Sequence, residues 1–239
     1  YNRGFRSGLF ASPIPPTVLS PETLDAYETG FKADLLAQRL RVNASAYYYL
    51  DKHRKAQAVV GGQSTVFDAK KAELYGLDAD VTWLATENLT IFAGLATIHA
   101  RYKDFTAAPI TVPRLPGGNN LTIGNATGKH LEATPDMTIN LAPSYRVPTQ
   151  IGEFKATVNY YYNDGWFAAP DNRVRQPSYT TWSADLTWNP SFSDRLTVRL
   201  WGKNLSNKVY WEQFSETTQS DNYQVGSGRS YGVTLGVHY

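Results

Sequence analysis

The sequence has 239 residues, with 23 basic and 21 acidic side chains, a formal net charge of +2 and no cysteine. This balance gives no basic surface for nucleic acid, and the lack of cysteine excludes disulfides, thiol nucleophiles and zinc clusters built on cysteine. The 16 tyrosines, 10 phenylalanines and 6 tryptophans favour β structure, and they are also the residues that form aromatic girdles at membrane interfaces.

Hydropathy excludes a membrane-spanning helix, because no stretch reaches the roughly 18 to 20 consecutive apolar residues that such a helix needs. The mean hydropathy of −0.40 resembles that of a soluble protein. A transmembrane β-barrel is not excluded by this value, since each of its strands keeps about half of its side chains polar. The start of the chain, residues 1–16, lacks the charged segment and apolar core of a signal peptide.

Strands are predicted in chain order wherever apolar and polar residues alternate, because successive side chains of a strand point to opposite faces. Residues 1–10 are expected to be the far end of a preceding strand or loop. In residues 89–102 both faces are partly apolar, so the register there stays open. About nine or ten strands are expected in total. The clearest ranges are 25–35, 39–51, 73–84, 89–102, 136–147, 153–167, 179–190, 194–205 and 230–239.

The connections between these strands alternate in length. Short links at 86–88, 148–152 and 190–194 carry turn-forming residues, and long links follow at about 104–130, 165–176 and 206–227. Outer-membrane barrels have this arrangement of short turns on one side and long loops on the other. Trp83 and Trp188 stand beside short turns, as interfacial residues would. A soluble β-sandwich or lectin-like domain is the alternative that the alternation leaves open.

Three motifs carry a resemblance to a known family. The first has Pro21, Glu22, Tyr27, Glu28, Gly30 and Lys32; the second has Asn204, Leu205, Asn207, Lys208 and Tyr210; the third is a last strand that ends on Tyr239. Their order and spacing resemble the C-terminal half of the barrel of a TonB-dependent outer-membrane receptor, and the resemblance covers nearly the whole chain.

The resemblance implies an all-β fold, a transmembrane antiparallel up-and-down β-barrel. Residues 1–239 would be the C-terminal portion of that barrel, because plugged outer-membrane transporters have about 22 strands. The signal peptide, the energy-coupling segment, the plug domain and the earlier strands are therefore expected to lie outside this sequence.

The resemblance also implies a function. Such a receptor lies in the Gram-negative outer membrane, binds a scarce nutrient outside the cell and imports it with energy from the TonB–ExbB–ExbD complex, which it contacts through its N-terminal part. A ferric siderophore is the family's commonest cargo; carbohydrates, cobalamin, haem and aromatic compounds are also carried. The implied partners are membrane lipid, a small-molecule or metal-chelate ligand and the barrel-assembly machinery. No cofactor and no nucleic acid are expected.

The alternation directs a set of charged side chains into the predicted lumen. They are expected to solvate the lumen and dock the plug through salt bridges, and the sharper hypothesis is that some of the basic ones attract an anionic cargo. The set consists of Arg39, Arg41, Asp78, Asp80, Asp185, Arg195, Arg199 and Lys203.

Aromatic residues in and beside the long loops form a second candidate set. They either grip a ligand at the entrance or belong to the outer girdle, and the sequence leaves both interpretations open. The set consists of Trp166, Phe167, Trp211, Phe214 and Tyr223.

The last strand is similar to the signal that the barrel-assembly machinery reads. Its apolar face would be formed by Tyr231, Val233, Leu235, Val237 and Tyr239. A final strand can pair along its whole length with another strand, which suits closure of a sheet.

Chemistry other than transport has little support. His53, His99, His130 and His238 lack metal-ligand spacing, and the sequence has no G-x-S-x-G elbow to anchor a hydrolase triad. No catalytic or metal-binding residues are therefore predicted. The alternatives kept are a barrel enzyme of the phospholipase or protease type and a barrel that serves adhesion or assembly.

Overall fold

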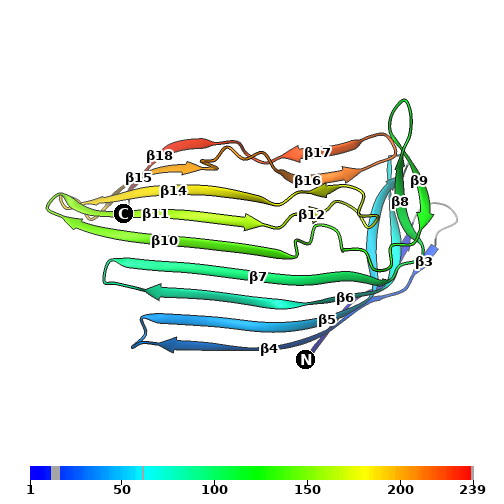
Figure 1. The fold of residues 1–239 in the computed structure, drawn as a ribbon, viewed down its shortest axis with the longest axis horizontal. Helices are drawn as coiled ribbons and strands as arrows, with labels where there is room; N and C mark the ends of the chain where they lie inside the picture. Colours follow the sequence, from blue (N-terminus) through cyan, green and yellow to red (C-terminus); the bar gives the residue numbers. More distant parts are fainter. Residues whose placement is uncertain (12–16, 61, 238–239) are drawn as a thin grey trace.

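The computed structural model describes residues 1–11, 17–60 and 62–237, and its regular elements are all β-strands. Ten antiparallel strands form one sheet in the order β1-β4-β5-β6-β7-β10-β11-β14-β15-β18 (Figure 1). Their bounds are β1 Asn2–Arg6, β4 Glu22–Leu35, β5 Leu40–Val60, β6 Gln63–Leu84, β7 Leu89–Asp104, β10 Met137–Thr149, β11 Gly152–Asn163, β14 Tyr179–Pro190, β15 Leu196–Lys203 and β18 Ser230–Val237. The predicted antiparallel all-β class and strand number are confirmed.

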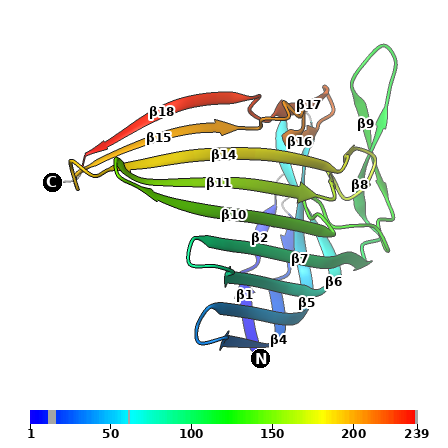
Figure 2. The same ribbon diagram turned by 60° about the vertical axis from the view of Figure 1, so that its left-hand side comes forward.

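The remaining strands form four small hairpins in the long connections. They are β2 (Leu9–Ala11) with β3 (Thr17–Leu19), β8 (Ala108–Pro113) with β9 (Asn119–Gly124), β12 (Trp166–Phe167) with β13 (Arg175–Gln176), and β16 (Trp211–Glu216) with β17 (Asp221–Val225). In Figure 2 the hairpins β8–β9 and β16–β17 lie at the end of the sheet away from the C-terminus. Among the described residues, no helix has the length and apolar character needed to cross a membrane.

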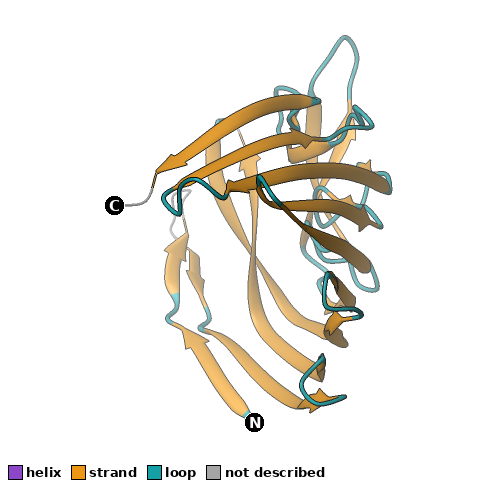
Figure 3. Ribbon diagram, turned by 90° about the vertical axis from the view of Figure 1, so that its left-hand side faces the viewer, coloured by secondary structure: helices purple, strands orange, loops and turns teal. Residues whose placement is uncertain are grey.

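Two faces of opposite character run through the sheet, which curves in Figure 3. On the apolar face, one register row crosses four strands as Tyr27, Tyr48, Tyr75 and His99. Trp83 lies eight residues down β6 from Tyr75, near the short turns. Between the row of Tyr75 and the level of Trp83, large apolar side chains are exposed and do not pack against protein. A second group of aromatic residues lies near the short turns and contains Phe154 and Trp188. Their rings stack at 6.0 Å, and Phe192 lies beside Trp188.

The structure resolves the open register of β7. Ile91 pairs with Trp83 and Leu95 with Ala79, so both belong to the apolar face. Phe92 and Ala96 alternate with them and belong to the opposite face, which we call the polar face.

Strands β5 and β6 are longer than predicted. Their hairpin continues about twelve residues past the aromatic row of Tyr48 and Tyr75, to Val60 and Gln63. His53 (φ 58°) and Lys70, which lie opposite each other, are both unpaired, and the register between β6 and β7 shifts between Lys71 and Ala72. The buried residues of β5 are Asp51 before His53 and Ala56 after it, so the period of two is lost there.

The predicted strand 153–167 also differs from the structure. Strand β11 ends at Asn163, and Trp166 and Phe167 form the separate strand β12. Gly165 between them has φ of 94°, a left-handed conformation that favours glycine, and it turns the chain away from the sheet.

A compact apolar core is found only at the long-loop end of the described residues. It packs Ala72, Ala100 and Tyr102 of the polar face against Phe105 and Leu131 of the β7–β10 connection. The core therefore stabilises a loop, and the exposed apolar rows of the sheet lie elsewhere.

A pair of neighbouring substitutions tests the assignment of the two faces. Leu95 is 39% exposed and lies midway between the aromatic levels of its face, whereas Ala96 faces the other way and pairs with Asp78. In the full-length protein refolded into lipid vesicles, we expect Leu95→Arg to lower the free energy of unfolding by about 2 to 4 kcal/mol. Ala96→Arg should cost less than about 1 kcal/mol, because it gains Asp78 as a neighbour. Equal costs in a denaturant titration would contradict the assignment.

Candidate functional site

The polar face carries ladders of side chains that pair across strands. Arg41 donates to Asp34 at 2.7 Å, and Asn43 donates to Asp80 at 2.8 Å. These contacts lie near the short turns, and they fix the charges in place while leaving the Arg41–Asp34 pair exposed. An exposed pair of this kind contributes little stability.

A pocket of about 290 Å³ opens on the polar face between β4, β5 and β6. Asp78, Asp80 and Lys32 line it, and Gly30 lies at its edge. A Cβ at Gly30 would stand 2.6 Å from the carbonyl oxygen of Ala44, so no larger residue fits. The pocket brings together the two predicted aspartates and the glycine and lysine of the first motif.

The other predicted polar-face residues lie on β14 and β15. Arg199 donates to Asp185 at 2.9 Å, and the ammonium of Lys203 lies 5.6 Å from the centre of the Trp201 ring. Arg199 keeps about half of its side-chain surface exposed, so it can contact a further group.

Two predicted residues differ from expectation in position. Arg39 lies in the turn between β4 and β5, and Arg195 lies in the turn between β14 and β15, so the strand alternation does not apply to either. The guanidinium of Arg39 donates to the carbonyls of Leu84 at 3.1 Å and Ala85 at 3.0 Å. Arg39 therefore ties two neighbouring short turns together.

Three of the five predicted loop aromatics come together on the β16–β17 hairpin. Trp211 lies 5.4 Å from both Phe214 and Tyr223, measured between ring centres, and the last two stack at 6.3 Å. Tyr223 is 58% exposed, so the cluster presents an aromatic surface to solvent.

The remaining two aromatics are on the β12–β13 hairpin. Phe167 packs against His130 at 4.8 Å and lies 5.5 Å from the guanidinium of Arg175. Trp166 pairs with Gln176, whose side-chain oxygen accepts a hydrogen bond from the backbone NH of Trp211 at 2.7 Å. The two hairpins are thus joined through Gln176.

A buried polar cluster, which we call the loop clasp, locks three long connections together. At its centre, Arg173 donates to Glu216 at 2.7 Å and to both carboxylate oxygens of Asp221, at 2.7 and 2.9 Å. Arg173 belongs to the β11–β14 connection, and the two acids belong to the β15–β18 connection. This bidentate arrangement is among the stronger hydrogen-bonded pairs in proteins.

The third connection joins the loop clasp through Thr111 of β8. Its backbone NH and hydroxyl donate to Asp171 at 2.9 and 2.6 Å, and the hydroxyl also contacts Glu216. Asn119 of β9 donates to Asp221 at 2.8 Å. Contacts across 60 to 105 residues of sequence therefore hold the long loops as one unit.

Two of the three acids of the loop clasp, Glu216 and Asp221, have pKa shifts in opposite directions. Burial raises the pKa of Glu216, whose side chain is 1% exposed and whose Oε1 has no hydrogen-bond partner. The hydrogen bond from Arg173 lowers the pKa of Asp221. The folded state therefore favours the charged form of Asp221 and disfavours the charged form of Glu216.

A cavity of about 230 Å³ adjoins the loop clasp. Glu216, Asp171 and Thr111 line this cavity. Its wall also contains Phe214 of β16 and Val59 of β5. The cavity, the aromatic cluster and the loop clasp all lie at the loop end of the sheet. This end is therefore the candidate functional site.

The sequence did not reveal the loop clasp. Its members lie in connections without hydrophobic period, so no pattern singles them out. The available signal was modest: charged residues Asp171 and Arg173 within an otherwise Gly-, Pro- and Asn-rich loop. No group of three or more potential metal ligands was found among the residues described.

The last strand pairs with β15 along its full described length, from Ser230 to Val237. Tyr231, Val233, Leu235 and Val237 are all exposed on the apolar face, as expected. Tyr239 lies outside the described residues. The role of the strand in assembly stays a prediction.

The second motif builds the turn that follows β15. The amide of Asn204 donates to the carbonyls of Lys208 and Ser227 at 2.9 and 3.0 Å, and Tyr210 stacks on Tyr179 at 4.6 Å. Asn207 accepts a hydrogen bond from the backbone of Arg229. The motif residues therefore position the backbone of this turn.

The loop clasp generates a prediction about pH. Because the pKa of Glu216 is raised, its contribution to stability grows as the pH falls through that pKa. Because the pKa of Asp221 is lowered, its contribution is present above the ordinary aspartate value of 3.8 and is lost as the pH falls from there through the lowered pKa. Hydrogen exchange of residues 211–225 in the full-length protein should therefore not accelerate between pH 7 and 5, after correction for the intrinsic exchange rate. Asp221→Asn should speed this exchange about tenfold, since it removes a charged acceptor. Glu216→Gln is the matched control and should have a smaller effect, because the amide oxygen can still accept from Arg173 and burial already disfavours the charge at this position. Loops that open on mild acidification, or equal effects of the two variants, would contradict this account.

Comparison with solved structures shows the same fold. The ferric yersiniabactin uptake receptor FyuA from Yersinia pestis is 15% identical, covers 98% of this chain with 33% of its own length, and superposes with a TM-score of 0.74. The siderophore receptor PiuA from Acinetobacter baumannii is 19% identical, with 92% and 29% covered and a TM-score of 0.70. The copper transporter OprC is 12% identical, with 92% and 31% covered and a TM-score of 0.67. This chain thus spans about a third of the length of these proteins.

The sequence identities to these solved structures are too low to show which family the chain belongs to. A match to a family model shows it. The model described as TonB dependent receptor-like, beta-barrel matches residues 1–205. Proteins of this kind are receptors and transporters of the Gram-negative outer membrane, so the apolar face contacts lipid and the polar face lines the lumen. The chain belongs to the TonB-dependent receptor family, as part of its outer-membrane β-barrel.

Proposed function

We propose that the protein is an active transporter that binds a scarce extracellular nutrient at the loop end of the barrel and imports it into the periplasm with energy delivered by the TonB–ExbB–ExbD complex. Family membership and the ordered long loops support this proposal. The observation that carries it is the loop clasp, because it makes one preformed surface from three connections. Preformed surfaces bind ligands without the cost of ordering a loop.

A ferric siderophore is the proposed cargo. FyuA is described as a ferric yersiniabactin uptake receptor and PiuA as a siderophore receptor, whereas OprC is described as a copper transporter. The fold alone therefore does not determine the cargo. The exposed Trp211, Phe214 and Tyr223 cluster offers apolar and aromatic contact, and the cationic groups of the lumen, such as Arg199, offer attraction for an anionic chelate.

Residues 1–239 are proposed to be a portion of a larger barrel wall. In the described residues β1 pairs only with β4, and β18 pairs only with β15, so each presents an unpaired edge. An open edge within hydrocarbon leaves backbone groups without hydrogen bonds, which costs several kcal/mol each. Further strands are therefore proposed to close the wall around a plug, with the charged residues of the polar face as plug contacts.

The C-terminal strand is proposed as the contact for the barrel-assembly machinery. Its support is the exposed edge of β18 together with the four apolar side chains on one face. Backbone pairing along such an edge needs no particular side chain on the partner strand.

Whole-cell uptake tests the proposed function. Uptake would be measured with a panel of ⁵⁵Fe-loaded siderophores that covers catecholate, hydroxamate and carboxylate chelators. For one of these chelates, a strain that lacks the receptor should take up at least about tenfold less iron than the wild type. The reason is that diffusion of the chelate through other pores is slow. In the complemented strain a protonophore should abolish uptake while surface binding at 4 °C persists. Uptake that is unchanged by the deletion, or that resists the protonophore, would overturn active transport. Repeating the panel with Cu²⁺ would reveal a different cargo.

A further inference from the structure

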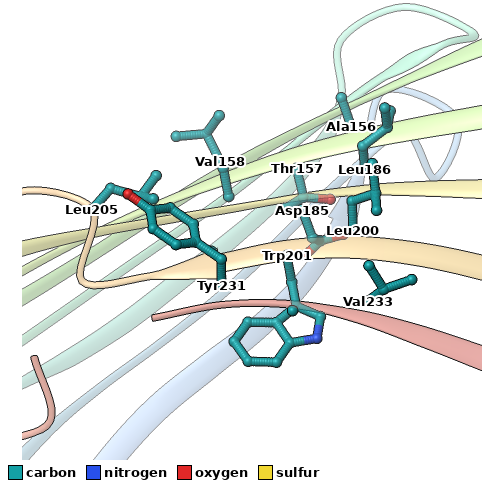
Figure 4. A pocket seen from close by; sticks show the side chains of 13 residues that line it. Ala156, Thr157, Val158, Asp185, Leu186, Leu200, Trp201, Leu205, Tyr231 and Val233 are labelled. Carbon is teal, nitrogen blue, oxygen red and sulfur yellow. The ribbon is translucent and has the colours of Figure 1, made fainter. Parts of the chain in front are cut away.

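Two cavities of the described residues differ in chemistry. A groove of about 690 Å³ crosses the apolar face over β11, β14, β15 and β18 (Figure 4). In Figure 4 the ring of Trp201 points to the opposite side of the sheet from Val158 and Tyr231. This groove lies on the face that contacts lipid, so its apolar lining follows from the barrel itself. The cavity of about 230 Å³ at the loop end is different, because buried acids line it.

Four segments that are far apart in the sequence form the wall of the loop-end cavity. They are residues 57–59 and 64 of the β5–β6 hairpin, residues 109 and 111 of β8, residues 168–171 of the β11–β14 connection and residues 214–216 of β16. A β-bridge between Val59 and Thr217 holds the hairpin beside the end of β16. The loop clasp joins the other segments through Thr111, Asp171 and Glu216. The cavity is therefore built into the folded loops.

The wall combines two buried acids with apolar side chains. Asp171 is 6% exposed, and the side chain of Glu216 is 1% exposed. Val59 and Phe214 contribute apolar surface, and no lysine, arginine or histidine is among the described residues that line the cavity. Negative charge within an apolar wall suits a cationic group at the end of a hydrocarbon chain.

One carboxylate oxygen of this wall lacks a hydrogen-bond partner. Oε2 of Glu216 accepts from two nitrogens of Arg173, at 2.7 and 3.0 Å, and from the hydroxyl of Thr111. Oε1 of the same carboxyl group is buried and has no partner among the described residues. A buried acceptor without a donor destabilises a fold, and a donor that enters the cavity would remove this cost.

The charge of Asp171 is not neutralised by an ion pair with a described residue. Its carboxylate accepts only from neutral donors, which are the backbone NH and hydroxyl of Thr111 and the backbone NH of Arg173. Lys129 donates to the backbone carbonyl of Asp171 at 2.7 Å but does not line the cavity. Burial raises the pKa of Glu216, and the charge of Asp171 raises it further. A cation in the cavity would therefore interact favourably with two acids.

We propose that this cavity binds a primary ammonium group at the end of an alkyl arm of the cargo, with Glu216 and Asp171 as the acids that attract it. A single free oxygen suits an ammonium group better than a guanidinium group, whose planar fork binds two acceptors. A metal ion is a weaker match, because Ca²⁺ takes about six to eight oxygen ligands. Among the described residues no group of three or more potential metal ligands occurs. The inference rests on the proposed transport function and adds that the transported chelate carries a free amine.

Hydrogen exchange of the full-length receptor tests the ammonium site without requiring a known cargo. The probe is n-butylammonium chloride, and the controls are n-butanol and sodium chloride at the same concentration. Residues 168–173 and 211–217 should exchange at least about threefold more slowly with n-butylammonium, because a ligand that must leave before the loops open slows exchange in proportion to its occupancy of the closed state. Neither control should slow the exchange.

Two pairs of variants make this test specific. Glu216→Gln keeps an oxygen that can accept from Arg173 but has no negative charge, so it should abolish the protection. Glu212→Gln removes an exposed acid of the same strand outside the cavity and should retain the protection. Ser64→Lys places a tethered ammonium group at an exposed position of the wall and should weaken the protection, whereas Ser64→Gln should not. Each variant is compared with itself without the amine, so a loosened clasp does not imitate the result.

Uptake of a matched pair of iron chelates tests whether the ammonium group belongs to the cargo. The pair is ⁵⁵Fe-loaded ferrioxamine B, a linear hydroxamate chelate with one free amine, and its N-acetyl derivative. With the wild-type receptor the KM of the acetylated chelate should be at least about tenfold higher, because a hydrogen bond to a charged group is lost. With Glu216→Gln the two chelates should have the same KM.

Several results would overturn the inference. Equal effects of n-butylammonium and n-butanol, or protection that survives Glu216→Gln, would remove the ammonium site. Equal KM values for the two chelates with the wild type, or transport of a chelate without an amine and of neither member of the pair, would remove the cargo arm. Loss of transport for every chelate of the panel would contradict the proposed transport function instead, and the exchange measurement would still decide the ammonium site.

Discussion

The structure depends on the requirement that every backbone NH and carbonyl group inside hydrocarbon must be hydrogen-bonded. Strand pairing meets this requirement for the eight inner strands of the sheet and for one edge of β1 and of β18, and the side chains then divide between lipid and lumen. Such a wall has no central core, which explains why large apolar residues such as Leu77 and Leu235 are exposed. The bilayer supplies the apolar environment that a core would supply in a soluble protein.

The loops face water and need their own means of stability. One is a small apolar core around Tyr102, and another is the loop clasp centred on Arg173. The two are built differently: the core excludes water, whereas the clasp satisfies most of its buried polar groups, though not Oε1 of Glu216, by hydrogen bonds. Together they convert long connections into an ordered surface above the lumen.

Sequence reasoning succeeded where the pattern is periodic. The strands 73–84 and 179–190 alternate without interruption, so their faces could be predicted. It failed at His53, where the left-handed backbone separates the buried Asp51 from the buried Ala56 and ends the period of two. It also could not find contacts such as Thr111 with Glu216, which are 105 residues apart. Spatial proximity of this kind leaves no periodic signal.

The family motifs identify the fold of the chain, but they do not identify its cargo. Gly30 permits a close backbone approach beside the polar-face pocket, and Asn204 organises a turn, so both shape the wall. A match to such motifs therefore identifies the scaffold. Cargo specificity is expected in the loops, where sequence reasoning had least to work with.

The two-faced wall is tested most directly by a cysteine scan of residues 91–96, in the strand whose register the sequence left open. The described chain contains no native cysteine, so each substitution introduces a single thiol for a fluorophore. In vesicles that contain nitroxide-labelled lipid, the account predicts strong quenching at positions 91, 93 and 95 and weak quenching at 92, 94 and 96. Uniform quenching, or the opposite phase, would contradict it.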